Sequence, residues 1–189
     1  MRLVRPATVE DAAALADVYR PYVLDTAVSF ETEPLDAAAM AERLTSRPRL
    51  PWLVAVRNEV VVGFAYASTH RARAAYRWAV DVSVYLRDDE RGQGTGRALY
   101  AELLPAVADL GHITAHAGIT LPNEASVGLH EALGFERVGV YRQVGHKLRR
   151  WHDVGWWRMS LREPAEQPEE PREWSSRQAR ASARRSTGI

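Results

Sequence analysis

The chain has 189 residues, enough for one well-packed domain and a terminal segment. Its hydrophobic content of 46% is ordinary for a globular protein, and its formal net charge of +1 creates no overall field that would attract a polyanion. Cysteine is absent, which excludes disulfides, thiolate metal sites and an acyl-cysteine intermediate. No apolar run has the length of a signal peptide or a membrane span, so we expect a cytoplasmic protein.

The first predicted helix follows Thr8, whose side chain can cap it while Asp11 reaches back. Apolar residues then recur at helical spacing: Ala12, Leu15, Val18, Tyr19 and Val23. A connecting segment, 26–34, contains one large apolar residue, Phe30.

A second helix is expected to begin at Asp36 and to end by Arg47, because Pro48 cannot continue it. Residues 52–56 and 60–67 then form a predicted β-hairpin. A polar, basic segment, His70 to Arg77, precedes a strand over 78–86.

The next segment is rich in glycine and reads Arg91-Gly92-Gln93-Gly94-Thr95-Gly96-Arg97. It opens a predicted helix that carries Leu99, Leu103 and Val107 inward and contains Pro105. Clustered glycines at a helix N-terminus can direct several N–H groups at a phosphate or pyrophosphate. The segment lacks the Gly-Lys-Ser/Thr of a P-loop and the glycine spacing of a dinucleotide fingerprint. Alone it would be more typical of a tight turn, but its place between a strand and a helix favours an anion site.

The remaining elements are a strand over 112–119, a helix over 126–133, and strands over 136–144 and 156–161. The order of elements indicates a mixed α/β domain with one central sheet. From residue 163 the chain offers little to bury, and we expect a disordered tail, acidic first and basic last.

Several aromatic and imidazole side chains have ordinary interpretations. His112 and His116 fall on one face of their strand like a metal pair, but no third ligand is nearby, so packing is favoured. Three tryptophans are expected in the core or at a dimer contact rather than in nucleic-acid stacking: Trp151, Trp156 and Trp157.

From Arg2 to Leu161 the chain resembles the GNAT acetyltransferase superfamily, and within it the phosphinothricin and methionine sulfoximine acetyltransferases. The glycine segment matches the Arg/Gln-x-x-Gly-x-Gly/Ala pyrophosphate loop of that superfamily. Further matches are Val28-Ser29-Phe30-Glu31-Thr32-Glu33-Pro34, Ala75-Tyr76-Arg77-Trp78, Ser83-Val84-Tyr85-Leu86, Leu129-His130-Glu131-Ala132-Leu133-Gly134-Phe135 and Trp151-His152-Asp153-Val154-Gly155.

The resemblance implies an α/β (α+β) GNAT acyl-CoA N-acyltransferase fold over residues 1–162, with a central mixed, mostly antiparallel sheet flanked by helices. It implies acetyl-CoA as co-substrate, no metal, a homodimer, and no nucleic-acid or membrane partner. A bulge near residues 81–84 would separate two strands around the thioester. The implied cofactor contacts are Val84, Tyr85, Leu86, Arg91, Gly92, Gln93, Gly94, Thr95, Gly96, Arg97, Asn123 and Ser126.

The resemblance also implies catalytic roles. Asp81 stands where relatives carry a glutamate base, and because it is one methylene shorter we expect it to act through water. His130 is expected to relay protons, and the N–H near Val84 to bind the thioester oxygen. Taken alone, Asp81 would be read as a solvated or ion-paired carboxylate and His130 as a core histidine.

Arg71 and Arg73 lie in the basic segment, and their guanidinium groups suit the acid group of an amino-acid-like acceptor. The predicted acceptor pocket comprises Phe30, Arg71, Ala72, Arg73, Tyr76, Asp81, Val82 and Ser83. The expected reaction is direct acetyl transfer from acetyl-CoA to such an acid within a ternary complex, with phosphinothricin or methionine sulfoximine as the diagnostic acceptor. Two alternatives stay open: acetylation of a protein N-terminus or lysine, and a non-catalytic CoA- or nucleic-acid-binding module that uses the basic tail.

Overall fold

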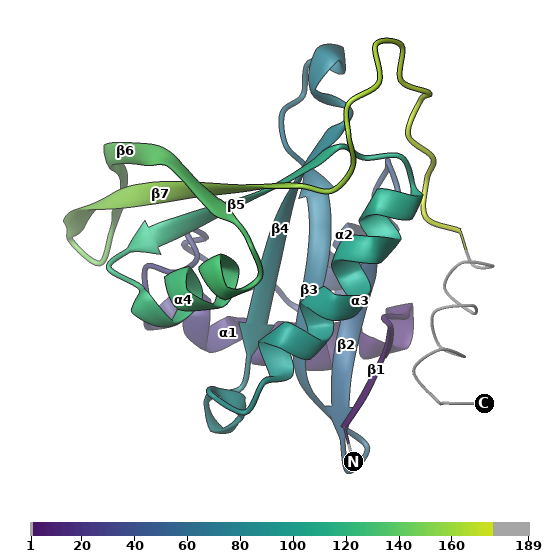
Figure 1. The fold of residues 1–189 in the computed structure, drawn as a ribbon. Coiled ribbons are helices and arrows are strands. Elements are labelled where there is room, and N and C mark those ends of the chain that lie inside the picture. The colour runs from purple at the N-terminus through teal and green to yellow at the C-terminus, as the bar shows by residue number, and fades with distance from the viewer. Residues whose placement is uncertain (1, 176–189) are drawn as a thin grey trace.

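The computed structural model describes residues 2–175, whose centre is a seven-stranded sheet with the order β1-β2-β3-β4-β5-β7-β6 (Figure 1). The strands are β1 (Arg2–Pro6), β2 (Trp52–Arg57), β3 (Val60–Thr69), β4 (Ala79–Leu86), β5 (Thr114–Leu121), β6 (Glu136–Lys147) and β7 (Arg150–Ser160). Neighbours are antiparallel except for β4 and β5, which pair in parallel. The expected mixed, mostly antiparallel sheet is confirmed.

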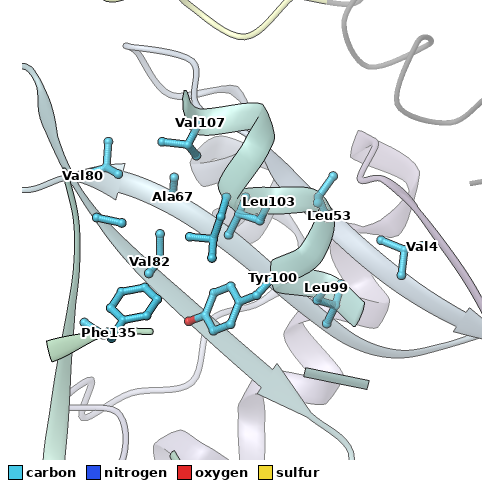
Figure 2. Packing of buried hydrophobic residues seen from close by; sticks show 14 of the residues in the cluster. Val4, Leu53, Ala67, Val80, Val82, Leu99, Tyr100, Leu103, Val107 and Phe135 are labelled. Carbon is cyan, nitrogen blue, oxygen red and sulfur yellow. The ribbon is translucent and has the colours of Figure 1, made fainter. Parts of the chain in front are cut away.

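Helices cover both faces of this sheet: α1 (Ala12–Leu24), α2 (Ala37–Thr45), α3 (Thr95–Asp109) and α4 (Glu124–Ala132). Side chains of α1 and α2 pack in one buried cluster with Phe64 and Tyr85 from the sheet. Side chains of α3 pack in a second cluster, and α4 packs against it. Figure 2 shows this second face, where Tyr100 and Leu103 of α3 lie over Val82 of β4. Alternate β4 side chains therefore enter different layers, as the period of two of a strand requires.

The strand β1 was not expected from the sequence. It contains only two consecutive apolar residues, Leu3 and Val4, before Pro6 ends it, which is too short a pattern to distinguish a strand from a loop. These residues form a strand because they pair with β2, from Arg2–Arg57 to Pro6–Leu53, and this pairing cannot be read from the local sequence.

The last two strands form one long hairpin, whereas the sequence predicted two shorter, separate strands. The hairpin turns at Leu148 and Arg149, whose φ angles are +51° and +64°. Two-residue turns with positive φ usually contain Asn or Gly, so a Leu-Arg turn carries no recognisable signal.

Residues 163–175, the first part of the expected tail, form no helix or strand but lie against the domain. The Arg172 N–H donates to the Leu110 carbonyl at 2.7 Å, and the Trp174 N–H to the Arg49 carbonyl at 2.8 Å. The rest of the expected tail, 176–189, lies outside the described residues. No helix within residues 2–175 is long and apolar enough to cross a membrane.

Candidate active site

The strands β4 and β5 pair only over their first residues. Their parallel register runs from Ala79–Thr114 to Asp81–His116, after which the strands diverge (Figure 1). A narrow cavity of about 50 Å³ lies in the resulting gap and is lined by residues of both strands. The register between β3 and β4 is uninterrupted from Gly63–Leu86 to Thr69–Val80, so the prediction of a bulge near residues 81–84 is wrong. The sheet opens because β4 and β5 diverge after Asp81 and His116.

The backbone of β4 offers hydrogen-bonding groups to this gap. The N–H of Arg87 donates to the Val62 carbonyl on the β3 side, whereas the Trp78 carbonyl accepts from the Ile113 N–H on the β5 side. Since backbone groups alternate sides along a strand, the even-numbered residues of β4 direct theirs toward the gap.

Of the three residues expected to contact the pantetheine arm, Val84 therefore faces the gap with its backbone, and Tyr85 faces β3. The Leu86 backbone also points away from β3, but it already meets Tyr22 of α1: its carbonyl accepts from the Tyr22 hydroxyl at 2.6 Å. Its N–H donates to the same oxygen at 3.3 Å. The Val84 N–H and carbonyl remain directed at the gap for an extended ligand to pair with.

The glycine loop precedes α3, as expected. Gly92 and Gly94 have φ angles of +73° and +76°, and no atom lies within 4 Å of where a Cβ would stand on either. Glycine supplies this conformation without steric cost and leaves the adjoining space open. The N–H groups of the first helical turn have no acceptor inside the helix and lie at its positive end. An anion such as a diphosphate fits this environment.

Side chains around the loop fix its shape. The Thr95 hydroxyl donates to Glu90, which is buried, at 2.6 Å. The Gln93 amide donates to the Asp89 carbonyl at 2.5 Å. Arg91 is paired with Asp88 at 2.8 Å, whereas Arg97 is exposed on the first turn of α3.

On the same face as α3, α4 brings three predicted site residues to the cavity: Asn123, Ser126 and His130. The Asn123 side chain caps α4 by accepting from the Ser126 N–H at 3.2 Å. The His130 Nδ1 lies 2.7 Å from the Ser126 carbonyl, which can only accept, so Nδ1 carries a proton. The Nε2 then accepts from the Tyr100 hydroxyl at 3.1 Å. Burial lowers the pKa of His130, which is therefore neutral with both ring nitrogens engaged.

The opposite face of the gap opens into a wider pocket of about 690 Å³. Its lining is Tyr19, Val28, Ser29, Phe30, Glu31, Tyr85, Gly118, Thr120, Tyr141, Val144, Val154 and Trp156. It shares Val28, Tyr85, Gly118 and Thr120 with the narrow cavity, so the two hollows meet at the gap.

The hairpin β6–β7 positions one wall of this pocket. The Lys147 ammonium donates to the Ser29 carbonyl at 2.6 Å, and the Ser29 hydroxyl shares a 2.6 Å hydrogen bond with Tyr19. Phe30 lies so close to Gly145 that a Cβ there would stand 2.1 Å from its ring. The segment 26–34 is thereby held against the hairpin.

Asp81 lies on the same face as this pocket, because the neighbouring Val80 and Val82 belong to the α3 cluster. Its Oδ1 is 2.6 Å from Nδ1 of His70, the residue that follows β3. Burial raises the pKa of Asp81, against the hydrogen bond from His70 and the charge of Arg71, which lower it. The His70 ring stacks on His116 of β5 with centroids 4.4 Å apart. Burial and nearby positive groups lower the pKa of His116 to about 4.

The predicted acceptor residues divide into three groups. Some line the hollows: Phe30 the wide pocket, and Val82 and Ser83 the narrow cavity. Arg71 lies 5.3 Å from the ring of Trp156, which lines the wide pocket, and Tyr76 lies edge-on to His70 at 6.0 Å. Ala72 and Arg73 are exposed and line neither hollow.

Sequence reasoning missed His70 and Trp156 as site residues. His70 stands in the basic segment already chosen for the acceptor, but its pairing with Asp81 depends on register across the β3–β4 hairpin. Trp156 was assigned to the core or a dimer contact, yet it lines the wide pocket and its indole N–H is buried without a partner among the described residues.

Two other features lie outside the gap between β4 and β5. A larger hollow of about 780 Å³ lies between α4 and the hairpin turn and shares Asn123 with the narrow cavity. His112 precedes β5, and its Nδ1 lies 3.1 Å from the Arg77 carbonyl, so it forms no pair with His116. Residues 2–175 contain no cluster of three or more His, Asp or Glu that could hold a metal ion.

A sheet that splits between its parallel strands, with a glycine-rich helix end on one face and a wide pocket on the other, is the arrangement expected of an acyl-CoA-dependent transferase. Residues 4–156 match the family described as the acetyltransferase (GNAT) domain, and the chain belongs to this family.

Similar proteins support this membership. The chain is 41% identical to the phosphinothricin N-acetyltransferase of Streptomyces viridochromogenes, over 86% of this chain and 89% of the relative. It is 33% identical to an L-methionine sulfoximine/L-methionine sulfone acetyltransferase of Pseudomonas paraeruginosa, over 84% and 94%. A crystal structure of a phosphinothricin acetyltransferase from Sinorhizobium meliloti in complex with acetyl-CoA superimposes with a TM-score of 0.81 at 34% identity, over 87% and 94%. The chain is an acetyl-CoA-dependent N-acetyltransferase.

Proposed function

We propose that this enzyme transfers acetyl from acetyl-CoA to the amino group of a small amino-acid-like acid of the phosphinothricin or methionine sulfoximine type. The observation that carries the proposal is the opening between β4 and β5, which joins the glycine-loop face to the 690 Å³ pocket. Both substrates can occupy the protein together from opposite faces, so the amine attacks the thioester directly in a ternary complex. The activities of the relatives, a phosphinothricin N-acetyltransferase and a methionine sulfoximine/sulfone acetyltransferase, favour this class of acceptor.

On the cofactor side, the diphosphate lies at the loop from Arg91 to Arg97 and the pantetheine arm lies along β4. The Val84 N–H, directed at the gap, binds the thioester oxygen and stabilises the charge that develops on it during attack. Asn123 and Ser126, which line the narrow cavity, contact the arm near its sulfur.

On the acceptor side, the acid group pairs with the guanidinium of Arg71, which lies beside Trp156 at the pocket. Phe30 supplies an apolar wall. The amino group of the acceptor then lies toward the hydrogen-bonded pair of Asp81 and His70, and this pair removes the ammonium proton.

The second predicted catalytic residue, His130, serves the leaving group in this proposal. Because its Nε2 accepts from Tyr100, His130 holds that hydroxyl at the narrow cavity. The hydroxyl can turn to donate a hydrogen bond to the departing sulfur, which stabilises a thiolate.

The proposal includes a homodimer. Five exposed apolar side chains of the β6–β7 hairpin support it: Val138, Tyr141, Val144, Leu148 and Trp151. We also place the protein in the cytoplasm, which the absence of cysteine fits and which cell fractionation tests.

The test is release of CoA thiol from acetyl-CoA in the presence of L-phosphinothricin, L-methionine sulfoximine and other amino acids. The absence of cysteine means that a thiol reagent reports only CoA. We expect thiol release and an N-acetylated product with at least one acid, and much less with the matching amine that lacks the acid group. Calorimetry with CoA alone accompanies the assay. Transfer only to a peptide N-terminus or lysine would contradict the proposal, as would CoA binding without transfer to any acceptor.

A further inference from the structure

A second imidazole, His70, contacts Asp81 at the point where the sheet opens. The 2.6 Å contact joins Nδ1 of His70 to Oδ1 of Asp81. Because an ionised carboxylate can only accept, Nδ1 carries the proton and donates it. The other ring nitrogen, Nε2, is then unprotonated in the neutral ring and can accept a proton.

The Nε2 of His70 is available. Among residues 2–175 it makes no hydrogen bond, and it is not one of the side-chain atoms sealed from solvent. The ring is nonetheless held on two sides. It stacks on His116 at 4.4 Å with an interplanar angle of 17°, and it meets the edge of Trp156 at 5.9 Å. A carboxylate contact at Nδ1 and aromatic packing on the ring leave a fixed acceptor atom.

The pair of His70 and Asp81 also lies where the two substrates would meet. Asp81–His116 is the last register pair of β4 and β5, so His70 and Asp81 lie at the vertex of the opening. Asp81 shares its face with the wide pocket, and Trp156, which His70 contacts, lines that pocket.

We propose that His70 is the proton-accepting residue of the acetyl transfer, acting through Nε2, and that Asp81 is a positioning residue that fixes its tautomer and stabilises the imidazolium. This inference rests on the proposed function and assigns the proton to a different atom from the carboxylate that the sequence suggested. This assignment explains why an aspartate can stand where relatives carry the longer glutamate. Asp81 does not have to reach the amine, because the imidazole of His70 lies between them.

The acceptor nitrogen loses two protons during the transfer. The acceptor enters as an ammonium ion, and His70 Nε2 takes one proton from its nitrogen. The free amine forms a bond to the thioester carbon, the carbon–sulfur bond breaks, and its electron pair leaves with sulfur. The second proton lost by nitrogen ends on the CoA sulfur, and His70 passes the first to solvent. One proton is released per turnover, and no redox partner is involved.

The groups that face His70 favour an imidazolium during the step. Asp81 from β4 is the neighbouring anion. His116 from β5 is neutral above about pH 4, so stacking on it places no second positive charge there. Arg71 of the same loop and Arg158 of β7 are cations near this cluster and oppose the charge, and Tyr76 contributes a ring edge.

The test is the variant His70→Asn, whose amide can still donate to Asp81 but has no basic nitrogen. We expect kcat to fall by about 10²–10⁴-fold, the usual worth of a positioned base. We also expect the acidic limb of the kcat–pH profile to disappear and CoA affinity by calorimetry to stay unchanged. The exposed His146 on β6 provides the matched control, His146→Asn, which should keep the wild-type profile.

Chemical rescue separates a proton acceptor from a structural residue. Imidazoles of different basicity added to His70→Ala should restore activity, and the logarithm of kcat should rise with their pKa. Rescue that is independent of pKa, or a His70→Asn enzyme with the wild-type rate and acidic limb, would overturn the proposal.

A measurement on the wild-type protein does not depend on any variant. Nitrogen NMR of labelled histidine should show His70 protonated at Nδ1 and bare at Nε2 once its ring is neutral. The opposite tautomer would contradict the dyad. If the wild-type enzyme releases no thiol with any acid, the proposed function fails. The tautomer of His70 seen by NMR still tests the hydrogen-bonded pair of His70 and Asp81 independently of activity.

Discussion

At the scale of single residues, the protein keeps three imidazoles neutral by burying them in different places. His112 lies beside the carbonyl of Arg77 at the end of the basic segment, His116 lies where β4 and β5 diverge, and His130 lines the narrow cavity. Burial is the largest cause of the lowered pKa of each. Solvent exposure in the unfolded chain restores their ordinary pKa near 6.5, so folding and protonation oppose one another.

The unfolding free energy should therefore depend on pH. Below pH 6.5 these histidines bind protons in the unfolded chain but stay unprotonated in the folded protein. The unfolding free energy therefore falls as the pH drops from 6.5 toward about 4, which are the pKa values of His116 in the unfolded and folded states. Urea unfolding between pH 8 and about 5, above the range where carboxylates titrate, should show a constant midpoint above pH 7 and a falling one below 6.5. His116→Gln should reduce the slope. A midpoint that rises on acidification would contradict this account.

At the scale of elements, the glycine loop and α3 work as one unit. Gly94 is the N-cap of α3 in the left-handed conformation, and the Ala98 N–H donates back to its carbonyl at 3.0 Å. The direction of the first-turn N–H groups, and hence the proposed diphosphate site, depends on Gly94 adopting a φ of +76°.

Gly94→Ala should therefore lower stability by about 1–2 kcal/mol, the cost of a Cβ in the left-handed region, and should weaken CoA binding. Space is not the cause, since a Cβ there meets no atom within 4 Å. Gly128→Ala is the matched control because Gly128 lies inside α4, also in open space but with helical φ. It should stabilise by up to about 1 kcal/mol with CoA affinity unchanged. Urea unfolding and calorimetry measure both, and equal effects of the two substitutions would contradict the argument.

At the scale of the whole molecule, the most exposed of the large apolar side chains among the described residues lie on the β6–β7 hairpin. Val138 and Trp151 are each 62% exposed. The hairpin also holds the pocket segment 26–34 through Lys147, so a partner subunit that covers the hairpin would lie next to the acceptor pocket.

We expect a mass near twice 21.2 kDa by light scattering, falling toward the single-chain value on dilution. Trp151→Lys should shift the equilibrium toward the single chain because it places a charge in the apolar contact, while Arg20→Lys on α1 should not. A mass of one chain at every concentration would rule out the proposed homodimer.

Much of this fold was predictable because its signals are local. The helices α1 and α2, the hairpin β2–β3 and the glycine loop each carry a pattern within about 15 residues that one element explains. The strand β1 and the Leu148–Arg149 turn carry no such pattern, since pairing alone determines them. The same division applies to the site. Motifs were enough to select Asp81, Asn123 and the glycines as candidate site residues. The Asp81–His70 contact joins residues 11 apart across a hairpin whose register no motif encodes.

The divergence of β4 from β5 has a consequence for how such an enzyme can change. In the proposed ternary complex, main-chain atoms of β4 hold the cofactor, and a side-chain replacement leaves such atoms in place. The acceptor lies on the opposite face, against the side chains of Trp156 and segment 26–34. We therefore expect replacements there to change which amine is acetylated without changing how the thioester is held.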